Sequence, residues 1–115
     1  MSRRARSKLT ARRHVCAPVF AALGDETRLR LVAKLCVGQP RSISQLTSGS
    51  KMTRQAITKH LRVLERAEIL RGVRAGRKKL FMFDPEPIEE ARQYLDLVSK
   101  QWDQVLSRLK LFVED

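Results

Sequence analysis

The chain has 115 residues, 43% of them hydrophobic, which is enough for one domain with a small core. Its 24 lysines and arginines outnumber 12 acidic residues and give a formal net charge of +12. An excess this large predicts a polyanionic partner such as nucleic acid or an anionic membrane surface. No apolar run reaches the roughly 20 residues of a transmembrane helix. Two cysteines cannot form a disulfide scaffold and are typical of free thiols in a reducing cytosol.

The charge is unevenly distributed along the chain. Residues 1–13 contain six basic residues and no acidic one, and residues 41–79 contain eleven basic residues against two glutamates. From residue 84 onward, eight acidic residues outnumber four basic ones. We interpret residues 1–13 as a basic N-terminal arm, flexible or leading into a helix, that adds salt-sensitive affinity for a polyanion. A signal or transit peptide is the alternative interpretation of this start.

Two helices are expected in the first third of the chain. The apolar residues of 15–23 predict a first helix, and Asp25 is a suitable N-cap for a second helix that ends near Val37. The periodicity of the second helix predicts an apolar stripe of Leu29, Val32 and Cys36, with Leu31 and Leu35 beside it.

Two more helices follow, one short and one longer. Ser42 and Gln45 have the spacing of a capping box and open a third helix that ends near Gly49. Thr53 is the expected N-cap of a fourth helix, which continues to about Arg66. This order of short helix, turn and longer helix is that of a helix-turn-helix, in which the second helix enters the major groove of DNA.

Beyond the fourth helix the periodicity changes to that of β-strands. Ile69–Arg74 and Lys79–Phe83 are expected to form a hairpin around a turn at residues 75–77. Leu80 and Met82 are expected to face the core. The tip of this hairpin carries the basic residues Arg74, Arg77, Lys78 and Lys79.

The last segment has the most regular apolar spacing. Intervals of three and four residues separate Ile88, Ala91, Leu95, Val98, Trp102, Val105, Leu109 and Phe112. This heptad-like seam predicts one long helix over residues 87–113, about 40 Å in length. Such a helix is too long for a small core to cover, so part of the seam is expected to face a second copy. The alternative is that the seam packs only on its own domain.

A second apolar stripe on this helix is expected to make the contact within the chain. It consists of Tyr94, Leu97, Leu106 and Leu111. We therefore assign a homodimer interface on this helix to Leu95, Val98, Trp102, Val105 and Leu109.

The helix over residues 53–66 has the composition of a DNA-reading element. Ile57, Leu61 and Leu64 occupy one narrow arc, and polar and basic residues occupy the other side. The expected base contacts are Gln55, Thr58, Lys59 and Arg62. The expected contacts to the DNA backbone or minor groove are Thr53, Arg54, Arg74, Arg77, Lys78 and Lys79. An ordinary solvated helix face is the alternative.

Two long stretches of the chain, "FAALGDETRLRLVAKL" and "SISQLTSGSKMTRQAITKHLRVLERAEILRGVRAGRKKLF", resemble the ArsR/SmtB family of bacterial winged-helix repressors. The resemblance is carried by the Asp25–Leu29 run, the His60–Leu64 run and the Gly76-Arg77 turn, and it extends over residues 15–113. It implies a mainly α-helical winged helix-turn-helix with a small β-hairpin. It also implies homodimers, paired through the first and last helices, that bind inverted-repeat operators and release them when an inducer binds. Pairing through the first helix adds Val19 and Phe20 to the expected dimer interface. No chemistry is assigned to His60.

The expected organisation has three parts: the arm, a DNA-binding core over residues 14–84, and a dimerisation helix over residues 85–115. The chain resembles family members that lack the metal motifs, because Ser42 and Ser44 stand where two metal-binding cysteines would be, and no histidine follows His60. Hydroxyls are poor ligands for soft metal ions. No metal and no cofactor is therefore expected, although His14, Cys16 and Cys36 would be three ligands if the fold brought them together.

A thiol switch at Cys16 and Cys36 is a minor alternative. The neighbouring Arg12, Arg13 and His14 are expected to lower the pKa of the Cys16 thiol, whereas Cys36 is expected in an apolar stripe. The inducer is not identified by the sequence, and both a small molecule and a redox signal stay open.

Taken together, these features predict a cytoplasmic, nucleoid-associated transcriptional regulator that recognises double-stranded DNA sequence-specifically, rather than an enzyme or a membrane-binding protein. We expect a repressor. The main alternative is a non-specific architectural or RNA-binding protein, and another is a protein-interaction module. Gln55 and Thr58 favour base readout, because architectural binding needs only cations.

Overall fold

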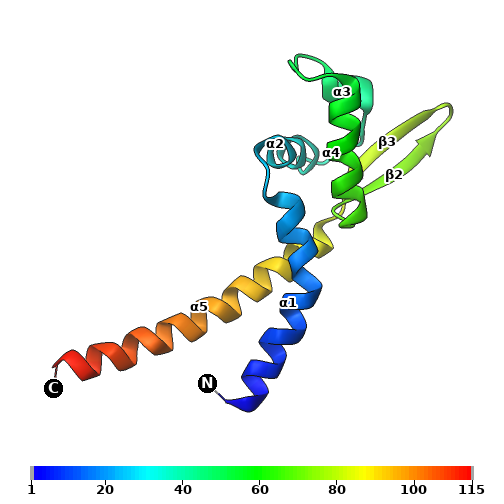
Figure 1. The fold of residues 1–115 in the computed structure, drawn as a ribbon. Coiled ribbons are helices and arrows are strands. Elements are labelled where there is room, and N and C mark those ends of the chain that lie inside the picture. Colours follow the sequence, from blue (N-terminus) through cyan, green and yellow to red (C-terminus); the bar gives the residue numbers. More distant parts are fainter. Residues whose placement is uncertain (1, 115) are drawn as a thin grey trace.

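Two long helices extend from a small head of helices and strands in the computed structural model, which describes residues 2–114 (Figure 1). Its principal extents are 67 × 27 × 22 Å. The elements in chain order are α1 (Arg3–Leu23), α2 (Glu26–Leu35), β1 (Arg41–Ser42), α3 (Ile43–Thr47), α4 (Arg54–Arg66), β2 (Leu70–Ala75), β3 (Lys78–Phe83) and α5 (Pro85–Glu114). The expected mainly α-helical winged helix-turn-helix is confirmed.

The three predicted helix N-caps, Asp25, Ser42 and Thr53, are confirmed. The carboxylate of Asp25 accepts a hydrogen bond from the backbone N–H of Arg28 at 3.0 Å, and Thr53 Oγ1 caps α4 at 3.1 Å. The capping box of α3 is complete, since Ser42 Oγ accepts from the backbone of Gln45 and Gln45 Oε1 accepts from the backbone of Ser42. Each cap satisfies amide groups that have no partner inside the helix.

Helix α1 begins twelve residues earlier than expected, at Arg3 instead of residue 15, with Ser2 as its N-cap. Residues 3–13 are therefore helical, in line with an arm that leads into a helix and not with a flexible one. Arginine, alanine, lysine and leucine are strong helix formers, and they make up most of this segment. Arg12 also ties it to α5 by donating to Gln93 Oε1 at 2.8 Å.

The inward stripe of α2 differs from the predicted one. Leu31 and Leu35 are buried and Val32 is partly buried, whereas Leu29 is 51% exposed and Cys36 is exposed. Only the packing of α2 against α4 and α1 selects between two adjacent apolar stripes on the same helix. The core of the head is completed by residues of α3, α4, the connection from α4 to β2, and the sheet, namely Leu46, Ile57, Leu61, Leu64, Ile69, Leu70 and Phe81.

The sheet has three antiparallel strands in the order β1-β3-β2, and β1 was not expected because two residues show no strand pattern. Gly76 takes a positive φ of 65° in the turn of the hairpin, which glycine adopts without strain. The prediction that Leu80 and Met82 face the core is wrong. Phe81 is buried instead, paired with Gly72 across the hairpin, because a shift of one residue exchanges the two faces of a strand.

The junction of α1, α2 and α4 is held by one side chain that the sequence analysis did not single out. The guanidinium of Arg28 donates to the carbonyl of Ala22 at 2.6 Å and to that of Ala21 at 3.5 Å, so it caps the end of α1. It also lies 3.2 Å from His60 Nδ1 on α4. Arginine has only donors, so His60 Nδ1 accepts and the ring carries its proton on Nε2.

Replacing Arg28 by alanine is expected to lower the free energy of unfolding by about 1–3 kcal/mol, because the carbonyl of the buried Ala22 loses its partner. Urea denaturation followed by circular dichroism measures this change. Arg30→Ala is the matched control, since Arg30 is exposed and two residues away on the same helix. Equal losses in the two variants would show that the Arg28 fork does not hold the junction.

Candidate nucleic-acid interface and exposed helix face

Helix α4 has its apolar arc in the core and its basic side in solvent. Ile57, Leu61 and Leu64 are at most 2% exposed. The exposed residues of α4 include Arg54, Gln55, Lys59, Arg62 and Arg66, and the cap Thr53 is exposed as well. Within the described part of the chain, none of these cations forms an ion pair. Their charges are therefore free to meet phosphates or base edges.

Thr58 is less available than the other predicted base contacts. It is partly buried, and its hydroxyl donates to the carbonyl of Arg54 at 2.8 Å. With its proton engaged in the helix, the hydroxyl offers only acceptor capacity to a base. Gln55, which is exposed and has both a donor and an acceptor, is the stronger candidate for a reader of adenine.

His60 on the same helix faces inward. It is partly buried, hydrogen-bonded by Arg28, and its Nδ1 lies 3.8 Å from a carboxylate oxygen of Asp25. The backbone N–H of Arg28 and the nearby positive charges lower the pKa of the Asp25 carboxyl, so this carboxylate stays charged. His60 therefore has a structural position at the junction.

The wing, defined as residues 70–83, has four basic residues near its tip. Three of them have no ion-pair partner among the described residues, and the fourth has one. Arg74, Arg77 and Lys78 are exposed. Lys79 Nζ lies 3.3 Å from a Glu65 carboxylate oxygen and 5.0 Å from the ring centroid of Phe81. Alternation along β3 puts Lys79 on the same face as Phe81, so its side chain turns toward α4. Lys79 thus has partners within the chain that compete with DNA.

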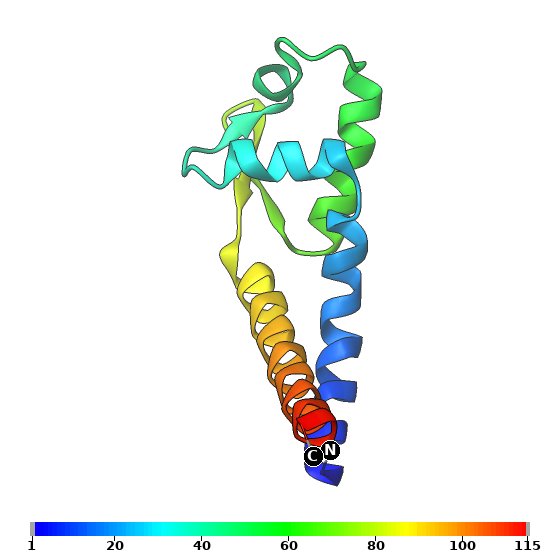
Figure 2. The ribbon, with the colours of Figure 1, turned by 90° about the vertical axis from the view of Figure 1, so that its left-hand side faces the viewer.

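The basic segment 3–13 lies at the opposite end of the molecule from α3, α4 and the wing (Figures 1 and 2). Charges are screened beyond about 8 Å at physiological salt. Within one chain, this segment therefore adds little to the electrostatic field at α4, and its contribution to the affinity for a polyanion stays a prediction.

Helix α5 leaves most of its apolar seam uncovered. Tyr94 and Leu97 are partly buried beside α1, and the Tyr94 ring lies 5.9 Å from the ring of Phe20, as the intramolecular stripe predicts. The other two residues of that stripe, Leu106 and Leu111, are exposed. Five seam residues are 39–58% exposed, namely Leu95, Val98, Trp102, Val105 and Leu109.

In the described chain no helix is long and apolar enough to cross a membrane.

Val19 does not belong with this exposed face. It is 5% exposed and contributes to the core of its own chain. Val19 therefore has almost no surface to offer a partner, and its assignment to the dimer interface is wrong. Phe20 is partly buried and keeps some accessible surface next to α5.

The two cysteines have the opposite environments from those expected. Cys16 is buried against α5, where its thiol donates to the carbonyl of Glu90 at 3.5 Å. Burial, with the nearby Glu90 charge, raises the pKa of the Cys16 thiol despite the neighbouring Arg12. Cys36 is exposed at the end of α2. No group of three potential metal ligands occurs within residues 2–114.

Comparison with known proteins gives consistent matches. A family described as "Helix-turn-helix domain" matches residues 23–73. The chain is 35% identical over 77 residues to the uncharacterised HTH-type transcriptional regulator YuzN of Bacillus subtilis, a match covering 62% of the chain and 84% of the relative. It is 31% identical over 77 residues to the HTH-type transcriptional regulator Rv2034 of Mycobacterium tuberculosis, covering 67% of the chain and 71% of that relative.

The fold is shared with solved structures as well. An ArsR-like transcriptional regulator from Rhodococcus sp. RHA1 matches with a TM-score of 0.76 and 31% identity, over 86% of this chain and 92% of that one. The matched share of the chain is larger than the helix-turn-helix of α3 and α4 alone. The chain belongs to the ArsR-like family of helix-turn-helix transcriptional regulators and is a DNA-binding regulator, not an enzyme.

Proposed function

We propose that the protein is a homodimeric repressor that reads an inverted-repeat operator in the nucleoid through α4 and grips the flanking phosphates through the wing. The proposal rests on the presence of two exposed surfaces on one chain, one basic and one apolar, that have no partner among the described residues. The exposed side of α4 has free cations and an exposed glutamine, and α5 has an exposed apolar seam. A bound dimer that covers a promoter excludes polymerase without any further contact.

The apolar seam supports the dimer. Contiguous apolar surface of this extent marks an interaction site on most soluble proteins. Trp102, at the middle of the exposed seam and 58% exposed, is the residue type that most often anchors an interface. A two-fold dimer places two α4 helices on one face of a duplex, which explains why an inverted repeat is the expected operator.

Regulation by an inducer also belongs to the proposal. A thiol sensor should be exposed and have a lowered pKa. Burial and the raised pKa of Cys16 do not suit that role, so Cys36 is the better candidate if the inducer is a redox signal.

Selection of bound duplexes from a random pool at about 0.15 M salt tests sequence-specific reading. We expect an enriched inverted repeat with half-site centres about one helical turn apart. Tight, salt-sensitive binding without enrichment would instead establish the non-specific architectural function.

Substituting Gln55 by alanine is expected to cost about 1–3 kcal/mol at one base pair of each half-site, because a bidentate contact to adenine is lost. Binding titrations on the selected operator and on single-base variants measure the effect. The variant should lose discrimination at that base pair only. Equal loss on matched and mismatched sites would show that Gln55 is not a reader.

Lys78→Ala should weaken binding to all sequences alike and make the slope of log affinity against log salt shallower by about one ion, because Lys78 is free to hold a phosphate. The control is Lys79→Ala, whose ammonium is already paired with Glu65 and should change the slope less. Binding curves at four salt concentrations distinguish the two. Identical slope changes would contradict the proposed difference between the neighbouring lysines.

Trp102→Ala should weaken the dimer by at least about 2 kcal/mol, since a buried tryptophan anchor is lost from both copies. Analytical ultracentrifugation measures the dissociation constant. Leu111→Ala is the matched control, because Leu111 is exposed on the same helix but outside the seam. A wild-type protein that stays monomeric at micromolar concentration, or an undiminished dimer in the Trp102 variant, would contradict the interface.

A further inference from the structure

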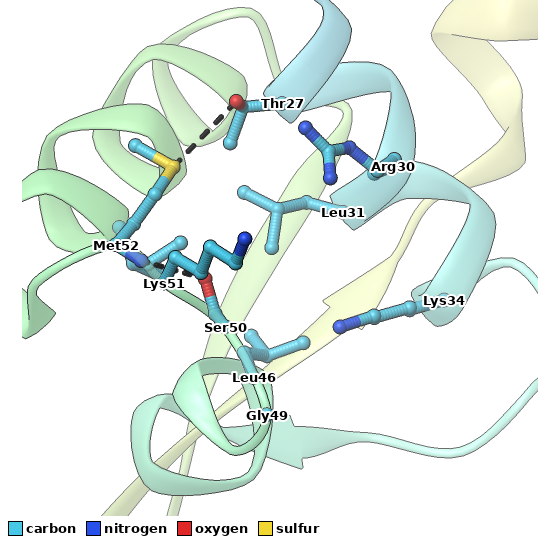
Figure 3. A pocket seen from close by; sticks show the side chains of 10 residues that line it. Thr27, Arg30, Leu31, Lys34, Leu46, Gly49, Ser50, Lys51 and Met52 are labelled. Atoms are coloured by element: carbon cyan, nitrogen blue, oxygen red, sulfur yellow. Dashed lines mark hydrogen bonds between the residues drawn. The ribbon is translucent and has the colours of Figure 1, made fainter.

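A pocket of about 430 Å³ lies between α2 and the turn that joins α3 to α4 (Figure 3). Arg30 and Lys34 come from α2, and Lys51 comes from the turn; Figure 3 shows all three side chains directed toward the same space. The pocket is lined by no acidic residue. None of the three cations has an ion-pair partner among the described residues. Three unneutralised cations around one space favour an anion there.

The floor of the pocket indicates which kind of anion fits. It is formed by Leu31, Leu46 and Ile57, which are only 1–3% exposed. Because the core already covers these side chains, the floor has little apolar surface left for the body of an organic ligand. Attraction must therefore come mainly from charge. Exposed ion pairs are individually weak, so a phosphate would be retained best when other contacts hold the molecule that carries it.

The position of the pocket points to such a molecule. Lys51 lies two residues before Thr53, the N-cap of α4. In Figure 1, α2 and the wing lie on opposite sides of α4. A helix in the major groove runs between two phosphate backbones, so basic groups on both sides of it meet different strands. The wing supplies cations for one side, and the pocket supplies them for the other.

We propose that Arg30, Lys34 and Lys51 form a phosphate site for the DNA backbone on the side of α4 opposite the wing. This site rests on the proposed insertion of α4 into the groove and extends the DNA contact to α2. It positions the recognition helix without reading bases, because phosphate contacts are independent of sequence.

The test uses the full-length double variant Arg30→Gln/Lys34→Gln and a duplex of fixed sequence. Loss of one phosphate contact should make the slope of log affinity against log salt shallower by about 0.9, so the ratio of wild-type to variant affinity should fall about threefold between about 50 and 150 mM salt. Lys110→Gln, an exposed lysine near the far end of α5, is the control and should leave the slope unchanged. Circular dichroism verifies that each variant is folded.

Methylphosphonate substitution locates the contact. Each phosphate of the duplex is neutralised in turn; one position outside the bases that α4 contacts should weaken wild-type binding and have no effect on the double variant. Equal sensitivity of both proteins at every position, or an unchanged slope in the double variant, would overturn the site. The salt-slope measurement works on any bound duplex, so absence of an enriched operator would refute sequence-specific reading without deciding this proposal.

A free anion is the other source of the same chemistry. Titration of the DNA-free protein with phenyl phosphate, followed by the amide signals of Gly49 and Lys51, should stay unsaturated at millimolar concentration. Saturation in the micromolar range, abolished in the double variant while DNA binding keeps its salt slope, would assign the pocket to a small phosphorylated ligand and overturn the DNA site.

Discussion

The guanidinium of Arg28 is the contact on which the arrangement of this protein depends. This guanidinium caps the C-terminal carbonyls of α1 and donates to His60 on α4. The backbone N–H of Arg28 donates to the carboxylate of Asp25. One planar group thereby joins the helix that runs beside α5 to the helix that is proposed to read DNA. Because the fork has fixed geometry, the angle between the long helices and the head is set by donors that cannot rotate independently.

This junction also gives a physical route between the two ends of the molecule. Arg28 holds the carbonyl of Ala22 at the end of α1 and donates to His60 on α4. The helices that are proposed to pair with a second copy are therefore joined to α4 through one side chain. Regulation through the proposed dimer needs no contact between an inducer and DNA.

The distribution of charge follows from which residues have partners inside the chain. Lys79, Arg71 and Arg92 are neutralised by Glu65, Asp84 and Glu89, respectively. The cations of α4, the wing tip and the pocket have no such partners in the described residues. Net charge alone predicts a polyanionic ligand, but only the folded chain distinguishes the cations that are free to bind it from those that stabilise the protein.

Local signals were sufficient for much of the fold. Helix caps at Asp25, Ser42 and Thr53, the amphipathic pattern of α4 and the heptad-like spacing of α5 depend on neighbours three or four residues away, so the sequence by itself determined these elements. It also determined the helix-turn-helix order and the class of partner. The candidate base-reading side of α4 followed from the same pattern, because the apolar arc leaves only one side for solvent.

The remaining features required tertiary structure because they depend on contacts between distant segments. Pairing across the hairpin decided that Phe81, and not Leu80 or Met82, enters the core, and packing on α5 decided that Cys16 is buried. A hydrogen bond from Arg12 to Gln93 ties the basic segment of α1 to α5. The convergence of Arg30, Lys34 and Lys51 joins two elements separated in sequence, and no local pattern records it. Sequence periodicity specifies which side of a helix is apolar; packing alone decides what each side meets.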